Sequence, residues 1–231
     1  MRRDLAAMLW KEYRQFRKNA ANEIGTIVVI AFLVAFLMPF GIVRSAVGRA
    51  VEPFSGVLAA LVIFAAFLYM SLVSEGSFSD EIQEGTMRML LATGIRPPAV
   101  FVAKWLALMA RAAALVITAA FFEFAALALQ SAGPVTLDLK WLAWGMGFAM
   151  LVSSYTAAAN AAVSLVTRTA MQFRQYGTVV SLIPLVALGG LAHLVGIGRG
   201  AISILSLLLF ALTVASFFIA VAAFRSEKTR A

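Results

Sequence analysis

The sequence contains no cysteine, a single histidine and few charged residues. The absence of cysteine excludes disulfides, thiolate metal ligands and thiol nucleophiles. A metal cage rich in histidine is also excluded, because His193 is the only histidine. No G-x-x-x-x-G-K-S/T phosphate loop is present, so the chain lacks the motif that cradles nucleotide phosphates in P-loop ATPases. We therefore expect no enzymatic activity, no metal and no cofactor in this chain by itself.

Charge is scarce and apolar residues are abundant. Only 13% of the residues are charged and 62% are hydrophobic, whereas soluble domains average about 25% charged and about 45–50% apolar. A net charge of +8 would suggest nucleic-acid binding in a soluble protein. Here the basic residues flank apolar runs, which favours a membrane protein without a nucleic-acid partner. Residues 1–22 lack an apolar core and a cleavage site, so a cleaved signal peptide is not expected.

Six apolar segments are long enough to cross a bilayer, which takes about 20 residues of helix. The sequence therefore predicts an all-α integral membrane protein in which residues 23–231 form a domain of six transmembrane helices. The third segment is too long for a simple upright span. The predicted spans are residues 24–43, 54–74, 99–130, 141–166, 177–195 and 201–224.

The distribution of basic residues predicts the orientation of these spans. With a cytoplasmic N-terminus, 15 of the 19 Lys and Arg residues face the cytoplasm, and Arg44, Arg49, Lys140 and Arg199 face outward. The opposite orientation reverses this bias and violates the positive-inside rule. We therefore expect a multi-pass protein of the cell membrane with both termini in the cytoplasm.

Residues 1–22 have the pattern of an amphipathic helix that precedes the first span. The apolar face repeats at spacings of three and four, and basic residues occupy the remaining surface. This pattern is typical of a helix that lies in the interface plane against anionic lipids. A soluble helix packed on a partner is the alternative. The apolar face comprises Leu5, Met8, Leu9, Tyr13 and Phe16.

The longest polar segment between two spans is residues 75–98, on the predicted cytoplasmic side. A short helix is expected to begin near Ser79 or Asp80, because acidic residues crowd the turns that follow and a helix N-terminus favours anions. Gly94 suits its C-terminal cap, and Pro97 can open the next helix. A partner pushing on this helix would move the second and third spans together. An ordinary loop helix with a solvated charged face is the alternative.

Two sequence runs carry a resemblance to a known family. EIQEGTMRMLL (81–91) followed by IRPPAVFVAK (95–104) resembles the hallmark of ABC-2 type transporter permeases, the membrane subunits of type V ABC exporters. VSLVTRTAMQ (163–172) resembles the connection between their fourth and fifth spans. The leading amphipathic helix is also usual in that family, so the resemblance covers nearly the whole chain in order.

The resemblance implies a half-transporter. Two copies of the permease pair, as a homodimer or with a related permease, and two separate ATPase subunits that bind ATP and Mg dock on the cytoplasmic side. Most relatives export hydrophobic or amphipathic molecules. A smaller branch serves haem delivery for cytochrome c maturation and is the alternative within the family. The residues expected to contact the ATPase are Asp80, Glu81, Glu84, Gly85, Thr86, Arg88 and Leu91.

Several polar residues lie inside the predicted spans, where they are costly and often functional. Glu123, Tyr155 and Asn160 are candidates for lining a transport pathway or a dimer contact, with hydrogen bonding inside the bundle as the alternative. Lys104 and Arg111 share one face of the third span and are expected to extend toward the headgroups. The fourth span combines small and polar residues, which predicts close helix packing.

Two functions outside the ABC family remain open. A stand-alone secondary transporter or channel is expected to show several ionisable groups inside its spans, or an internal repeat. The sequence has one acidic residue in a span, Glu123, and no repeat. A membrane scaffold that transports nothing leaves the segment 75–98 without an explanation.

Overall fold

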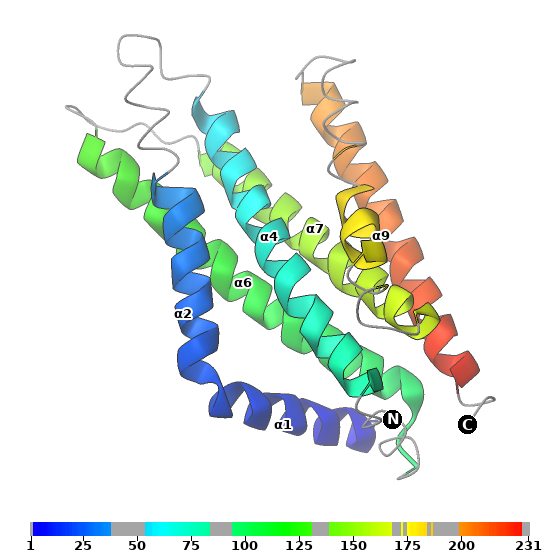
Figure 1. The fold of residues 1–231 in the computed structure, drawn as a ribbon. Helices are drawn as coiled ribbons and strands as arrows, with labels where there is room; N and C mark the ends of the chain where they lie inside the picture. The colour runs from blue at the N-terminus through cyan, green and yellow to red at the C-terminus, as the bar shows by residue number, and fades with distance from the viewer. Residues whose placement is uncertain are drawn as a thin grey trace.

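The computed structural model is a bundle of long helices with one helix lying across its end (Figure 1). The residues that it describes contain no β-strand. They are residues 2–37, 54–83, 94–130, 139–167, 172, 175–183, 186 and 199–227. The helices in chain order are α1 (Arg2–Lys18), α2 (Ala20–Ala31), the π-helix η1 (Phe32–Leu37), α4 (Phe54–Gln83), α6 (Pro97–Gln130), α7 (Leu139–Val166) and α9 (Arg199–Glu227).

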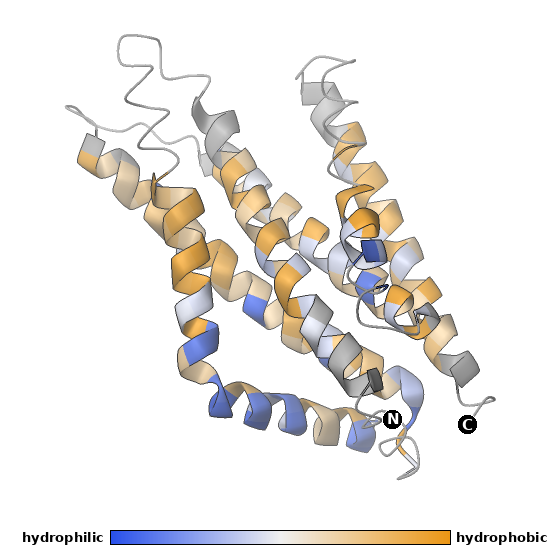
Figure 2. Ribbon diagram, viewed as in Figure 1, coloured by the Kyte–Doolittle hydropathy of each residue, from blue (hydrophilic) through white to orange (hydrophobic). Residues whose placement is uncertain are grey.

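Five helical segments in these ranges are long and apolar enough to cross a membrane: Ala20–Leu37, Ala59–Phe78, Pro97–Ala126, Leu142–Leu165 and Ile204–Phe224. Their ribbons are mostly apolar, whereas α1 is mostly polar (Figure 2). Large side chains on them are exposed, including Leu207 and Phe218 of α9. Exposed apolar surface of this extent is consistent with an integral membrane protein. Of the predicted span 177–195, residues 177–183 and 186 are helical, and the others lie outside the described residues.

A single residue, Asn19, separates α1 from α2. Its backbone N–H still donates to the carbonyl of Phe16 at 3.1 Å, and its own carbonyl accepts from the N–H of Glu23 at 3.0 Å. The chain therefore turns sharply at Asn19 while these two hydrogen bonds are kept, and α1 crosses the end of the bundle (Figure 1). The predicted amphipathic helix is present, and it ends at Lys18.

The two sides of α1 have different surroundings. Met8 and Glu12 are buried, and α1 packs on α6. On the open side, Trp10 and Tyr13 are 59% and 51% exposed, with their rings stacked 5.6 Å apart. Tyr and Trp are the residues enriched at membrane–water interfaces, because they present an apolar ring and a polar tip. This arrangement fits a helix at the membrane surface.

The expected start of a new helix near Ser79 or Asp80 is wrong, because α4 runs without a break from Phe54 to Gln83. No proline interrupts α4, and each of its two glycines, Gly56 and Gly76, costs the helix only about 1 kcal/mol. The buried side of α4 continues past residue 74, where the sequence predicted the span to end, to the end of the apolar segment Ala59–Phe78. Phe78 is fully buried, with its ring 6.3 Å from that of Phe101. Asp80 therefore lies near the C-terminal end of a long helix.

The first residue of α6 is the proline at which the sequence predicted that a new helix can begin. The helix starts at Pro97, where the missing N–H of proline costs no hydrogen bond. Gly94, three residues earlier, has a φ of 82°, a backbone conformation that glycine adopts without strain. At this end of the bundle Phe101 also contacts Phe224 of α9, with ring centroids 5.5 Å apart. Aromatic packing thus joins the ends of α4, α6 and α9.

The helices α4 and α7 approach closely at Gly145. A Cβ atom on Gly145 would lie 2.8 Å from the Cβ and 2.9 Å from the Cα of Ala59. Real Cβ atoms do not come this near to another carbon, so the backbones touch only because the residue is glycine. Small residues at helix crossings permit this kind of packing in membranes. The predicted close packing of the fourth span is confirmed here.

Replacing Gly145 with alanine should therefore destabilise the bundle by a net of about 1–2 kcal/mol, since overpacking outweighs the gain in helix propensity. Gly147 is the matched control, because a Cβ there meets nothing within 4 Å. Gly147→Ala should be neutral or stabilising by up to about 1 kcal/mol. Thermal unfolding of both variants in the same detergent measures the difference. Equal shifts in the same direction would contradict the close contact.

Candidate functional site

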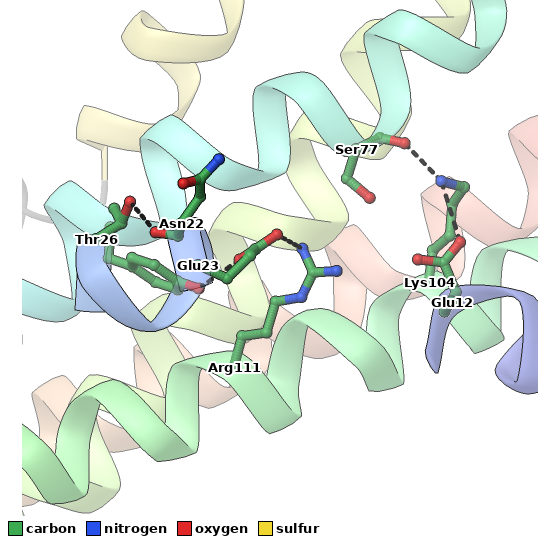
Figure 3. Close-up of polar contacts among 8 residues, drawn as sticks. Glu12, Asn22, Glu23, Thr26, Ser77, Lys104 and Arg111 are labelled. Carbon is green, nitrogen blue, oxygen red and sulfur yellow. Dashed lines mark hydrogen bonds and ion pairs between the residues drawn. The ribbon is translucent and has the colours of Figure 1, made fainter. Parts of the chain in front are cut away.

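Four charged side chains meet where α1, α2 and α4 pack against α6. Lys104 and Arg111 lie two turns apart on α6 and therefore share one face. Each is paired with a glutamate, Lys104 with Glu12 of α1 and Arg111 with Glu23 of α2. We call this group, together with Tyr69 and Ser77 of α4, the junction (Figure 3).

Lys104 connects three helices. It is 2% exposed, and its Nζ lies 3.4 Å from Glu12 Oε1 as an ion pair without hydrogen-bond geometry. The same Nζ donates a hydrogen bond of 2.6 Å to the backbone carbonyl of Ser77. It also lies 5.7 Å from the ring centroid of Phe78. One ammonium group therefore holds α1 and the polar end of α4 against α6.

Arg111 forms the second half of the junction. Its Nη1 lies 3.0 Å from Glu23 Oε1, and its guanidinium lies 5.7 Å from the ring centroid of Phe16. The hydroxyl of Tyr69 donates to Glu23 Oε2 at 3.4 Å. Glu23 thus receives one contact from α6 and one from α4. Because Glu23 lies in the first turn of α2, next to Asn19, these two contacts stabilise the turn between α1 and α2.

The expectation that Lys104 and Arg111 extend toward the headgroups is wrong. Both side chains are turned into the protein and paired, because two glutamates from α1 and α2 reach the same face of α6. Neither glutamate was singled out from the sequence. A signal for Glu12 existed, since it lies four residues after Met8 and four before Phe16. An acid in the apolar stripe of an amphipathic helix indicates a buried partner.

The junction holds two positive and two negative charges, so its formal charges balance. The part of the chain that the structure describes contains no group of three His, Cys, Asp or Glu residues that could hold a metal. The arrangement is suited to mechanical linkage. A displacement of the polar end of α4 would act directly on α1 and α6 through Lys104.

A second polar cluster lies between α4, α7 and the helix at 175–183. Asn160 is 1% exposed; its Nδ2 donates to Ser74 Oγ at 2.6 Å, and its Oδ1 accepts from Ser181 Oγ at 3.3 Å. Tyr155 donates from its hydroxyl to the carbonyl of Val180 at 3.1 Å. These two candidates for a pathway or dimer contact thus bond to groups of the same chain. The contacts hold three helices together by hydrogen bonds, as polar residues in membrane helices commonly do.

Glu123, the third candidate of this kind, has different surroundings. It is 2% exposed and lies on the buried side of α6, between Ala119 and Ala126. Neither carboxyl oxygen has a hydrogen-bond partner among the described residues. Glu123 therefore differs from Tyr155 and Asn160. Those two side chains form hydrogen bonds within the bundle, whereas the Glu123 carboxyl forms none with the described residues.

The residues expected to contact an ATPase fall in two groups. Asp80 and Glu81 belong to the last turn of α4, close in sequence to Ser77 and the junction. Five others lie outside the described residues, namely Glu84, Gly85, Thr86, Arg88 and Leu91. His193, the single histidine, also lies outside them. Of the predicted coupling segment 75–98, the structure thus describes residues 75–83 and 94–98, and residues 84–93 lie outside the described residues.

Comparison with models of known protein families finds no match, and no curated protein matches the chain at a significant level.

Proposed function

We propose that this chain is the membrane-spanning permease subunit of an ABC-2 type transporter, driven by a separate ATPase. In this proposal residues 23–231 form six transmembrane helices in the cell membrane, with both termini in the cytoplasm. Two permease subunits and two ATPase subunits assemble, and ATP and Mg bind to the ATPases. The substrate is a hydrophobic or amphipathic molecule that is exported.

The observation that carries the proposal is the junction at the end of α4. Lys104 bonds to Ser77, only four residues before Glu81, where the family-like run 81–91 begins. It also contacts Glu12 on the helix that crosses the end of the bundle. A motor protein that pushed on residues 80–91 would therefore move α1, α4 and α6 as one body, because packed cores transmit displacement with little compression. A permease without its own ATPase needs a linkage of this kind.

A second candidate, a stand-alone secondary transporter, is favoured by one observation. Glu123 is a buried acid without a hydrogen-bond partner in the described part of the chain, and an ionisable group inside a span is a mark of ion-coupled transport. A single such group with no acidic or histidine partner among the described residues supports this candidate less than the junction supports the first. No described residue favours the haem-delivery alternative.

Affinity purification from the native membrane in mild detergent, followed by quantitative mass spectrometry, tests the proposal. We expect an ATPase with a P-loop motif to be recovered in a near-equimolar amount. Recovery of the chain alone in several detergents would contradict the proposal and favour the secondary transporter. Glu123 would then be the residue to change first.

A further inference from the structure

An apolar pocket of about 340 Å³ lies in the corner where α1 turns into α2 beside α6. This volume is at the lower end of the range for small-molecule sites, about 300–1,000 Å³, and suits one narrow apolar chain. Three helices contribute to its wall, with Leu9, Tyr13 and Phe16 from α1, Ile24 and Ile27 from α2, and Leu106, Ala107, Ala110 and Ala114 from α6.

The charged residues at the pocket do not make it polar. Glu12 and Arg111 contribute to its lining, but each is already paired, with Lys104 and Glu23 respectively. On the α6 side, Ala110 and Ala114 are exposed and small, which leaves space that larger side chains would fill. The pocket is thus an apolar recess on the side of the bundle. Val28, one turn of α2 beyond the lining residue Ile24, is also exposed and apolar.

Positive charge lies next to this recess. Tyr13 lines the pocket and stacks on Trp10 at 5.6 Å, and the guanidinium of Arg14 lies 6.0 Å from the Trp10 ring. Arg17 comes four residues after Tyr13, on the same side of α1, and both arginines are exposed. A ligand with an apolar tail in the pocket would therefore carry its polar end beside two cations.

We propose that this corner is a binding site for one anionic phospholipid, with an acyl chain in the pocket between α1, α2 and α6 and the headgroup beside Arg14 and Arg17. The chemistry of the corner matches the two ends of such a lipid. The bound lipid fills the space that the turn at Asn19 opens between a surface helix and a spanning helix. The site does not depend on the proposed ATP-driven transport.

Native mass spectrometry of the full chain in detergent micelles that contain equal amounts of phosphatidylglycerol and phosphatidylcholine tests this site. We expect the wild-type chain to retain phosphatidylglycerol in preference, by about fivefold for each arginine, since a basic residue near an anionic surface contributes about that factor. The double variant Arg14→Gln, Arg17→Gln should lose the preference. Equal retention of the two lipids by the wild type would overturn the proposal.

Filling the pocket tests the position of the acyl chain. Ala110→Phe should remove the retained phosphatidylglycerol, and Ala114→Leu, a smaller change, provides a second test if the first variant unfolds. Ala215→Phe is the matched control, because Ala215 is an exposed alanine on α9, away from the pocket. Retention by both pocket variants at the level of Ala215→Phe would overturn the proposal. A shift in oligomeric state instead of lipid retention would do so too, by assigning the pocket to a second copy of the chain.

Discussion

Replacing Lys104 with methionine should lower the stability of the bundle by about 3–5 kcal/mol, the usual cost of leaving the partner of a buried ion pair without its counter-charge. Methionine keeps most of the volume of the lysine stem. It removes the ion pair to Glu12 and the hydrogen bond to the Ser77 carbonyl. At about 2–4 °C per kcal/mol for a chain of this size, the midpoint of thermal unfolding should fall by roughly 6–20 °C. Unfolding in detergent, followed by size-exclusion chromatography, measures this.

A double-mutant cycle separates the pair from general damage to the core. Glu12→Gln combined with Lys104→Met removes both charges, so the double variant should be more stable than the sum of the single losses indicates. Lys18→Met is a suitable control, since Lys18 is exposed in the last turn of α1; its effect should stay within about 1 kcal/mol. Strict additivity of the two single variants would show that Glu12 and Lys104 do not interact.

Replacing Glu84 with arginine should reduce the amount of ATPase that copurifies with the permease by about tenfold, which corresponds to about 1.4 kcal/mol. The reason is the reversal of a charge at a surface that the proposed function assigns to the ATPase, where like charges oppose association. ATP hydrolysis should then no longer depend on the permease, so transport is uncoupled. The ratio of the two subunits by quantitative mass spectrometry and the rate of ATP hydrolysis measure these effects, and unchanged thermal unfolding of the variant shows that it still folds.

Glu52→Arg is the matched control for this experiment. It makes the same charge reversal in the segment between the first two predicted spans, which the positive-inside rule places on the opposite side of the membrane. It should leave the ATPase bound. If Glu84→Arg retained the ATPase and Glu52→Arg lost it, both the coupling segment and the orientation would be wrong. If both variants retained it, the ATPase contact would lie elsewhere.

Much of the architecture could be predicted from local patterns. The amphipathic stripe predicts α1, proline at position 97 predicts the start of α6, and runs of apolar residues predict the five membrane-length helices in the described ranges. The close contact of α7 was expected from its small residues, and Gly145 makes it. The helices depend on neighbours in the chain, so spacing and propensity suffice to find them. The small residues of α7 can likewise be found in the sequence, although the residue that Gly145 meets, Ala59 of α4, lies far away in it.

The candidate site was harder to predict, because its contacts join residues far apart in the sequence. Lys104 meets Glu12 and Ser77, and Arg111 meets Glu23, only after α1 has folded across the end of the bundle. The charge pattern of α6 alone indicated exposure, since an unpaired cation in a span lowers its energy by reaching the headgroups. Similarly, the acidic residues after Ser79 indicated a helix start, whereas α4 runs through this position to Gln83, with Phe78 buried just before it.

Composition and periodicity suffice to establish that this chain is helical and apolar enough for a membrane, because they are local properties that need no partner. Which charges are buried together, and which polar residues bond within the chain, depends on how the helices pack, as the bonds of Asn160 to Ser74 and Ser181 show. The same packing opens a recess beside the turn at Asn19. The physical reason is that the cost of burying a charge or an amide depends on the group it meets, and that group is supplied by another helix.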